Sequence, residues 1–277
     1  MAGFKEFKVR WGMVIDVDKC DGCGDCILAC QAENNIPPNQ DPQDRLRSLN
    51  WLTVYELDNG KKYPDNETTY LLRPCMQCGY PPCVSVCPVI ATDKNEEGGI
   101  VSQIYPRCIG CRYCMAACPY HARYFNWHDP VWPEGMEKTL SPHTSVRPRG
   151  VVEKCHFCHH RFMYAKDANR VAGKDPLDIE DGQYTTACAD ACTSGAIKFG
   201  DLNNPDHEVY HLAKSKYAFR LLERLHTDPQ VYYISKHEWV RRQGDNYLEG
   251  EKLPVHEHGG DHGGDHDGSN DGGGHHG

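Results

Sequence analysis

The sequence lacks a long hydrophobic run and a recognisable export signal. No stretch approaches the roughly eighteen apolar residues that a membrane-spanning helix needs, and residues 1–17 contain neither an apolar signal core nor a twin arginine. Hydrophobic residues fill only 39% of the 277 positions, beside 26 glycines and 18 prolines. A large, regular hydrophobic core is therefore not expected, and another interaction must hold much of the chain together.

Cysteine is abundant instead. The sixteen cysteines form four groups: Cys20, Cys23, Cys26, Cys30; Cys75, Cys78, Cys83, Cys87; Cys108, Cys111, Cys114, Cys118; and Cys155, Cys158, Cys188, Cys192. Disulfides are disfavoured, because the small secreted domains that depend on them carry export signals. Zinc is disfavoured because its tetrahedral sites use two separated ligand pairs, whereas three evenly spaced cysteines followed by a fourth overfill such a site.

Iron–sulfur ligation fits the spacing best. Residues 108–119 reproduce the bacterial ferredoxin run C-x2-C-x2-C-x3-C-P, in which three cysteines bind one cluster and the fourth binds the neighbouring cluster. Residues 20–30 repeat this spacing without the proline. Residues 75–88 keep the proline but place four residues, instead of two, between the second and third cysteines. The last group is split between 155–158 and 188–192. Because the fourth cysteine crosses over, the motifs must work in pairs.

Two other cysteine motifs compete with this interpretation. A radical-SAM motif, C-x3-C-x2-C, is excluded because the required third position holds Glu33, Ile90, His121 or Gly195. Residues 155–159, "CHFCH", match the pattern for covalent haem attachment, C-x-x-C-H, and this alternative stays open. Against it, haem would leave Cys188 and Cys192 without partners. His159 is otherwise an ordinary polar residue after a cluster ligand.

The four motifs, in their order and spacing, resemble the four-cluster electron-transfer subunit of the dimethyl sulfoxide reductase family of respiratory molybdopterin oxidoreductases. The relatives include the iron–sulfur subunits of polysulfide, tetrathionate and arsenate reductases and of alternative complex III. Residues 30–37, 111–120 and 145–158 add to the likeness, which covers about residues 12–235.

The resemblance implies four [4Fe–4S] clusters that exchange their fourth ligands in pairs. The expected ligand sets are Cys20, Cys23, Cys26 and Cys192 (site A); Cys155, Cys158, Cys188 and Cys30 (site B); Cys75, Cys78, Cys83 and Cys118 (site C); and Cys108, Cys111, Cys114 and Cys87 (site D). Some relatives replace the second cysteine of the third motif and hold a three-iron cluster there. Because Cys111 is present, four cubanes are expected.

The fold class is expected to be α+β, with two ferredoxin-like di-cluster domains, one nested within the other. Short β-rich runs at 12–17, 99–104 and 196–200 flank the cysteine loops, and 51–57 with 68–73 predicts a hairpin. The expected divisions are an outer domain (1–70 and 150–200), an inner domain (71–125), a surface arm that packs on a partner (126–149), a C-terminal packing segment (201–247) and a disordered Gly/Asp/His-rich tail (248–277).

Two smaller features complete the interpretation. Apolar residues at helical spacing predict a helix over 216–226 that covers a core. Five cations lie next to or near expected ligands in the sequence: Arg73, Arg107, Arg112, Lys154 and Arg161. Such charges can tune cluster potentials or simply balance the negative charge of the clusters.

The resemblance implies an electron conduit without catalytic residues of its own. Its expected partners are a molybdopterin-type catalytic subunit and an integral membrane quinone-binding subunit, with a cytochrome c subunit as a further candidate, and no nucleic acid. Membrane association would come from these partners, and the periplasmic side is favoured because a folded subunit can be exported on a partner's signal. Two alternatives stay open: a conduit for a hydrogenase or multihaem cytochrome complex, and a free-standing polyferredoxin.

Overall fold

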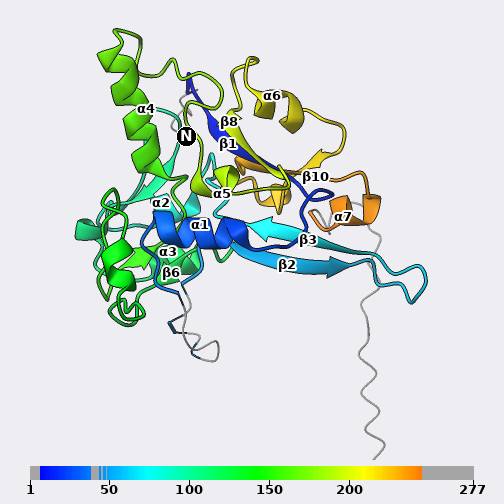
Figure 1. Cartoon of the computed structure of the whole chain (residues 1–277), viewed down its shortest axis with the longest axis horizontal. Helices are drawn as coiled ribbons and strands as arrows, with labels where there is room; N and C mark the ends of the chain where they lie inside the picture. The colour runs from blue at the N-terminus through cyan, green and yellow to red at the C-terminus, as the bar shows by residue number, and fades with distance from the viewer. Residues whose placement is uncertain (1–6, 39–43, 45, 48, 245–277) are drawn as a thin grey trace, which may run out of the picture.

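The computed structural model describes residues 7–38, 44, 46–47 and 49–244, and short elements alternate along the chain (Figure 1). The strands are β1 Trp11–Asp16, β2 Thr53–Asp58, β3 Thr68–Arg73, β4 Thr92–Lys94, β5 Val101–Gln103, β6 Tyr124–Phe125, β7 Val152–Glu153, β8 Ile197–Asp201, β9 Ala218–Phe219 and β10 Val231–Ile234. The helices are α1 Asp25–Glu33, α2 Pro82–Ser85, α3 Tyr113–Ala116, α4 His159–Val171, α5 Ala187–Asp190, α6 Glu208–Ala213 and α7 Glu238–Arg242, with 3-10 turns η1 Tyr105–Arg107, η2 Met136–Thr139 and η3 Glu223–Leu225. The mixture agrees with the α+β prediction.

The largest sheet joins the two ends of the described chain. Its strand order is β8-β1-β10-β9, and β1 pairs antiparallel with β8 and parallel with β10. Both faces of β1 are covered, because Met13 and Ile15 belong to the main core while Val14 packs with Val209 of α6. The cysteine loop after β1 is thereby placed beside the loop before β8, which contains Cys192.

Three two-stranded sheets carry the remaining strands. The predicted hairpin is confirmed, since β2 pairs antiparallel with β3 from Thr53 opposite Arg73 to Asp58 opposite Thr68. The other pairs are β4 with β5 and β6 with β7. The β-rich runs predicted at 12–17, 99–104 and 196–200 correspond to β1, β5 and β8 within two residues.

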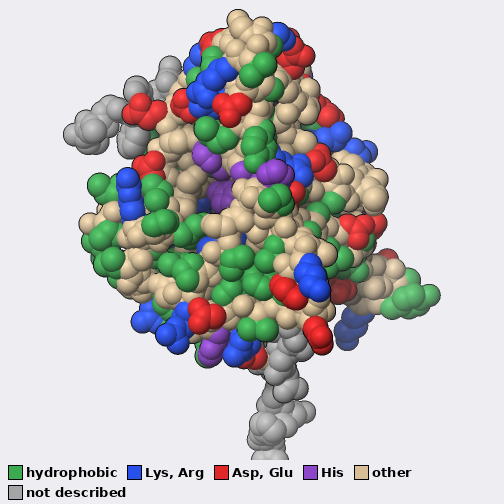
Figure 2. All heavy atoms as spheres, turned by 60° about the vertical axis from the view of Figure 1, so that its left-hand side comes forward, with side chains coloured by type: hydrophobic (Ala, Val, Ile, Leu, Met, Phe, Trp, Pro, Cys, Tyr) green, Lys and Arg blue, Asp and Glu red, His purple; other side chains and the backbone are tan. Residues whose placement is uncertain are grey.

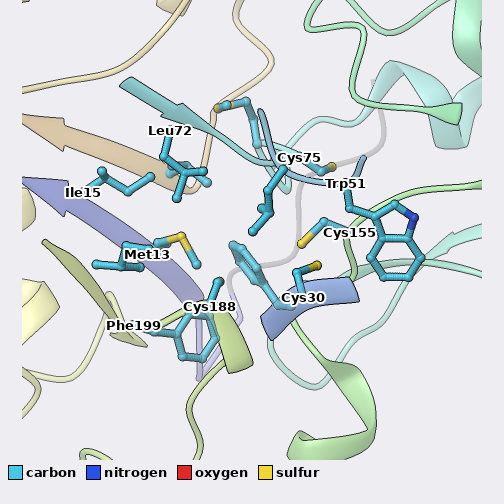
Figure 3. Close-up of a cluster of buried hydrophobic side chains, with 14 of the residues drawn as sticks. Met13, Ile15, Cys30, Trp51, Leu72, Cys75, Cys155, Cys188 and Phe199 are labelled. Carbon is cyan, nitrogen blue, oxygen red and sulfur yellow. The ribbon is translucent and has the colours of Figure 1, made fainter. Parts of the chain in front are cut away.

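The main hydrophobic core contains cysteines as well as aromatic and aliphatic residues. Figure 3 shows Cys30, Cys75, Cys155 and Cys188 among buried side chains such as Phe199. Trp11 adds an edge-on contact to Tyr184, with ring centroids 4.7 Å apart. Because thiols occupy positions that aliphatic side chains would otherwise fill, the core alone stabilises the fold less than its buried volume suggests.

The helix predicted over 216–226 is wrong. This segment forms the short strand β9, which pairs with β10, and then the 3-10 turn η3 between Leu222 and His226, both of which have positive φ angles. The Arg220 side chain forms an ion pair with Asp228, whose Oδ1 lies 2.7 Å from its Nη1. Leu221 and Leu222 do pack on the core, so the apolar spacing reflected burial without a helix.

The segment 126–149 packs partly on the protein itself. Most of its first half is exposed, but the Asn35 side-chain nitrogen donates hydrogen bonds to the carbonyls of Ser141 and Thr144 at 2.9 and 2.7 Å. Arg147 is buried and pairs with Glu153 at 2.8 Å. The second half is therefore anchored next to α1.

The tail predicted at 248–277 lies outside the described residues. Within the described part, none of the helices has the length and apolar character to cross a membrane.

Candidate metal centres

Site D is a pocket bordered by four thiols from two motifs. Cys108, Cys111 and Cys114 line it together with Cys87, which the second motif contributes. The loop between Cys108 and Cys111 depends on Gly110, which has a φ of +70° and lies so close to Gly150 that a Cβ atom would be 2.4 Å from its carbonyl oxygen. Any other residue at this position would displace the loop.

Site C is a second pocket with the reciprocal arrangement. Cys75, Cys78 and Cys83 line it with Cys118, which belongs to the third motif. All four thiols are buried. Burial, followed by the charge of Cys75, raises the pKa of Cys78 to about 12, and a hydrogen bond from Thr227 partly opposes this shift. The second and third motifs have therefore exchanged their fourth cysteines in space.

Site A combines the first motif with the last cysteine of the sequence. Burial raises the pKa of Cys26 to about 12, and the nearby charges of Cys20, Cys192 and Cys23 add to this shift. Cys23 is exposed, so this site reaches the surface. Cys192 lies in the loop between α5 and β8, which the pairing of β8 with β1 holds beside the first motif.

Site B is the most deeply buried group. Burial raises the pKa of Cys30 well above its ordinary value, and the charges of Cys155, Cys158 and Cys188 raise it further. All four thiols are buried. The contacts between α1 and α5 bring Cys30 to Cys188.

A histidine-lined groove adjoins site B on the surface. Figure 2 shows histidine side chains in this hollow, which measures about 370 Å³. It is lined mainly by Tyr105, His143, Arg147, His156, His159, His160 and Tyr164. His159 places its Nε2 atom 3.5 Å from the side-chain nitrogen of Asn95, while Cys155 and Cys158 are grouped with the other site B thiols. This arrangement favours a cluster over covalent haem at "CHFCH".

Polar groups outside the motifs approach the thiols. The Asn34 side-chain nitrogen lies 3.6 Å from the Cys30 sulfur, and the Thr186 hydroxyl oxygen lies 3.2 Å from the Cys188 sulfur. The Ala91 backbone N–H donates to the Cys87 sulfur at 3.2 Å. Sequence reasoning missed these groups. Only the position of Asn34, one helical turn after Cys30, was a usable signal.

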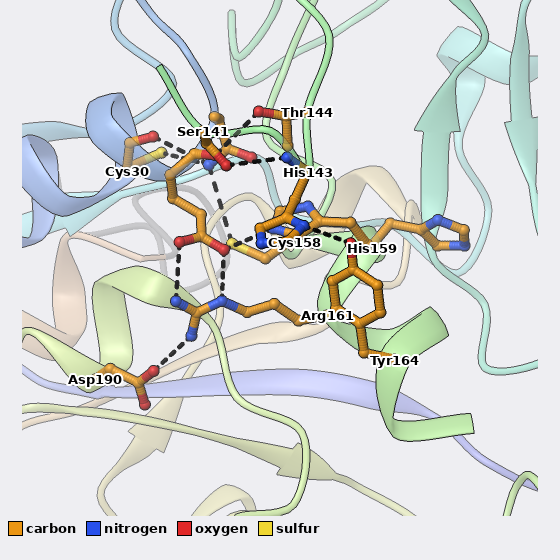
Figure 4. A network of polar contacts seen from close by, with 12 residues as sticks. Cys30, Ser141, His143, Thr144, Cys158, His159, Arg161, Tyr164 and Asp190 are labelled. Carbon is orange, nitrogen blue, oxygen red and sulfur yellow. Dashed lines mark hydrogen bonds and ion pairs between the residues drawn. The ribbon is translucent and has the colours of Figure 1, made fainter. Parts of the chain in front are cut away.

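Two of the five predicted cations are held near site B by ion pairs or hydrogen bonds. Arg161 forms ion pairs with Glu33 and Asp190 beside Cys158, as Figure 4 shows. Hydrogen bonding from Arg161 lowers the pKa of Glu33 to about 2. Lys154 is fully buried and donates to the backbone carbonyls of Val101 and Cys155.

The other three predicted cations face outward or stack on aromatic rings. Arg107 and Arg112 are exposed, and the Arg112 guanidinium lies 4.6 Å from the ring centre of Trp127. Arg73 lies 4.8 Å from the ring centre of Tyr55. Arg112 also lines the site D pocket. Solvent screens the exposed charges of Arg107 and Arg112, so their effect on the sites is expected to be small.

Arg123 is a buried cation that sequence reasoning missed. Its side chain is 4% exposed and lines the site C pocket. Burial by itself would lower the pKa of Arg123, but the charges of Cys83, Cys114 and Cys75 together raise it. The only sequence signal was its position five residues after Cys118.

The four sites form a row. The charge of Cys26 in site A raises the pKa of Cys188 in site B, and the charge of Cys75 in site C raises the pKa of Cys155 in site B. Likewise, the charge of Cys83 in site C raises the pKa of Cys114 in site D. The order of neighbours is therefore A, B, C, D. The thiols of B and C are all buried, whereas A and D each contain one exposed cysteine.

The donor set fits iron–sulfur clusters. Each predicted quartet consists of thiols alone, the ligands that [4Fe–4S] clusters use, and at C and D the four thiols border a pocket. Within the described residues, no three Cys, His, Asp or Glu side chains are placed to hold a single metal ion. A cluster bound by these thiols would supply one-electron exchange, and the protein's own residues would fix its place and its electrostatic surroundings.

Comparison with known proteins agrees with this chemistry. Two family models, each described as a 4Fe-4S dicluster domain, match residues 66–134 and 19–91. The first match spans the second and third motifs, and the second match spans the first and second. The protein thus contains 4Fe-4S dicluster domains of the ferredoxin type.

Curated relatives place the protein among reductase subunits. It is 73% identical over 253 residues to the iron–sulfur cluster-binding subunit of menaquinone reductase from Nitratidesulfovibrio vulgaris, covering 91% of this sequence and 99% of the relative. The protein belongs to this family of iron–sulfur subunits. It is also 38% identical to a subunit of selenate reductase from Mesobacillus selenatarsenatis (82% and 73% covered) and 35% identical to a subunit of polysulfide reductase from Wolinella succinogenes (81% and 94% covered). It is accordingly an iron–sulfur electron-transfer subunit, and the catalytic step takes place in another subunit of its complex.

Proposed function

We propose that the protein carries four [4Fe–4S] clusters at sites A to D and conducts electrons along that order. The observation that carries this proposal is the row of thiol quartets, in which the two inner quartets are buried and each outer quartet has an exposed member. Buried inner clusters are protected from solvent oxidants, while outer clusters can approach redox centres of other subunits. The ligand sets are those expected from the sequence.

The same grouping supports a nested arrangement of two di-cluster domains. Sites A and B take their ligands from residues 20–30 and 155–192, and sites C and D take theirs from residues 75–118. The inner domain would then interrupt the outer one. The pairing of β1 with β8 and β10, which closes the outer part, is in keeping with this division.

We propose a molybdopterin-type catalytic subunit and a membrane quinone-binding subunit as the partners at the two ends of the row. The relatives named for menaquinone, selenate and polysulfide reductases favour this over a hydrogenase, a multihaem cytochrome complex or a free polyferredoxin. A cytochrome c subunit would be an additional partner. Attachment to the membrane through these partners, on its periplasmic side, completes the proposal.

The two ends of the row differ in chemistry, and this difference supports a different partner for each end. Around site D three apolar side chains are more than half exposed, beside the exposed cations Arg107 and Arg112: Ile90 (63%), Ile109 (65%) and Tyr113 (60%). Around site A the exposed residues include Asp18 and Asp21, with one large apolar side chain, Leu28. An apolar face suits a permanent contact with a membrane subunit, because its burial stabilises the complex. Site D is therefore assigned to the membrane subunit and site A to the catalytic subunit.

Metal content tests the cluster proposal. Four clusters require about sixteen irons and about sixteen acid-labile sulfides per chain. Iron and sulfide analysis of the purified complex, corrected for clusters in other subunits, gives the count. Stoichiometric zinc in place of iron, or covalent haem on a denaturing gel, would contradict the assignment.

Site-specific crosslinking tests the assignment of partners. A photo-crosslinking residue placed at Ile109 should capture the membrane subunit, and one placed at Leu28 should capture the catalytic subunit. A matched control at exposed Val171, on α4, should capture neither. Capture of the catalytic subunit from position 109 would reverse the orientation of the row.

A further inference from the structure

Arg123 is buried without a carboxylate partner. It is 4% exposed, and within the described residues its hydrogen bonds to oxygen atoms go to two neutral side chains, Thr92 and Gln103. The similarly buried Arg147 differs, because it pairs with Glu153 at 2.8 Å. An unpaired buried charge strongly destabilises a fold, so the negative charge of the site C and D thiolates, or of the clusters that they would bind, is needed to compensate it.

The guanidinium lies in the wall between two cluster sites. Arg123 lines the site C pocket, and its Nη1 atom donates to Thr92 Oγ1 at 3.2 Å and Gln103 Oε1 at 3.1 Å. Thr92 and Gln103 in turn line the site D pocket. One side of the planar group is thus held by residues of the site D wall, while the arginine itself borders site C.

Two donor atoms of the same group have no oxygen or nitrogen partner. Nε and Nη2 of Arg123 are both buried, and within the described residues the guanidinium side chain interacts with the thiols of Cys83 and Cys114 instead. Buried N–H groups are almost always satisfied. Cys83 of site C and Cys114 of site D lie near enough for their charges to act on this arginine. The free N–H groups and the positive charge therefore face the sites where anionic clusters would be bound.

We propose that Arg123 donates its free N–H groups to sulfur at the junction of sites C and D and raises the reduction potentials of both clusters. This inference rests on the proposed ligand sets. A positive charge and N–H donors near cluster sulfur stabilise the reduced, more negative state. The guanidinium also lowers the repulsion between two neighbouring clusters that are both reduced, since it lies between them. Clusters A and B lack this charge and keep their potentials.

Arg123→Gln tests the proposal in the complete, cluster-loaded complex. A potentiometric titration followed by EPR should show the potentials of two clusters, C and D, shifted downward, while those of A and B stay unchanged. Repeating the titration in a Cys111→Ser background identifies the site D cluster by its altered signal. Arg107→Gln is the matched control: Arg107 is exposed next to Cys108, and water screens its charge, so all four potentials should stay as in the native protein.

A conservative variant separates charge from packing. Arg123→Lys keeps the positive charge and should leave the two potentials closer to the native values than Arg123→Gln does. Four unchanged potentials in Arg123→Gln, or equal shifts of all four clusters, would overturn the proposal.

A second position keeps the test decisive if Arg123→Gln does not load clusters. Gln103→Glu puts a carboxylate next to Nη1 and pairs the guanidinium within the protein, so it should lower the same two potentials with Arg123 in place. Unchanged potentials in that variant would refute the inference. Failure of the underlying ligand sets would show separately, as a wrong iron count or as loss of the wrong cluster in cysteine variants.

Discussion

The side-chain nitrogen of Asn34 lies 3.9 Å from the sulfur of Cys158, although 124 positions separate the two residues. The same nitrogen lies 3.6 Å from the sulfur of Cys30 and donates to the Cys30 carbonyl at 3.0 Å. Asn34 therefore connects the first and last cysteine motifs without being a ligand. It gives site B an N–H donor at the centre of the protein.

Replacing Asn34 with alanine should lower the reduction potential of the site B cluster. The variant loses an N–H donor to two ligand sulfurs, and such donors stabilise the reduced state. EPR-monitored titration of the complex measures the shift. Asn126→Ala is a suitable control, because Asn126 is equally buried but donates to the Pro148 carbonyl. Equal potentials in the native and Asn34→Ala proteins would remove Asn34 from any role at this cluster.

Cys30→Ala should damage the site B cluster and spare the site A cluster. Cys30 follows the first motif by only four residues, yet its thiol is grouped with Cys155, Cys158 and Cys188. Anomalous iron maps or titrated EPR signals identify the missing centre. Cys192→Ala is the reciprocal variant, and it should cost the site A cluster alone. Loss of site A in the Cys30 variant would show that the motifs do not exchange ligands.

Cys111→Ser should convert the site D cluster into a three-iron centre. Cys111 is the exposed member of its quartet, so an iron that it held would be open to loss into solvent. The iron content should fall by about one per chain, and an oxidised-state EPR signal of a three-iron cluster should appear. Four unaltered cubane signals together with a full iron count would exclude Cys111 as a ligand.

Glu33→Gln should destabilise the protein by about 1–3 kcal/mol, because it leaves the partly buried Arg161 without its main partner. The melting temperature of the loaded protein measures this. Glu180→Gln serves as the control. Glu180 pairs with Lys174 but is 74% exposed, so its loss should leave the melting temperature nearly unchanged.

The Glu33 effect should persist at every pH above the unfolded-state pKa of this carboxyl. The pKa of Glu33 is lowered from 4.5 to about 2, first by hydrogen bonding from Arg161, so its contribution is complete above the unfolded-state value and is lost only as the pH falls toward 2. His160 also contacts Glu33, with its Nε2 atom 2.6 Å from Oε1, so protonation of this histidine can change the size of the effect between about pH 5 and about pH 8 but not remove it. A difference in melting temperature between the native and Glu33→Gln proteins that disappears near pH 5 would contradict the ion pair.

The sequence predicted the β2–β3 hairpin and the strands beside the cysteine loops, because each depends on local spacing. The four ligand sets, which join distant motifs, rested instead on the resemblance to a known family. The sequence did not indicate which residues from distant segments become neighbours in the folded protein. Arg123 and Asn34 are ordinary residues in sequence, and only the folded chain places them against thiols contributed by distant motifs.

The wrong helix over 216–226 has a similar origin. Apolar residues at helical spacing are also produced by a turn whose side chains reach a core from an irregular backbone. Here the pairing of Phe219 with Tyr233 across β9 and β10, and the attraction of Arg220 to Asp228, decide the conformation. Both partners lie at least eight residues away in the sequence, so a local pattern could not indicate them.

The place of β1 between β8 and β10 also bears on how the protein is made. A ribosome delivers Trp11–Asp16 before any of the cysteine motifs, but the strands on either side, Ile197–Asp201 and Val231–Ile234, emerge only after all four motifs. Until then the hydrophobic residues of β1 have no partner strand. The segment with the thiols of sites C and D is complete before either strand emerges, so the proposed clusters there could be inserted first. Maturation would thus proceed from the middle of the sequence outward, and a nascent polypeptide that stalled before β8 would leave an apolar strand open to chaperones and to aggregation.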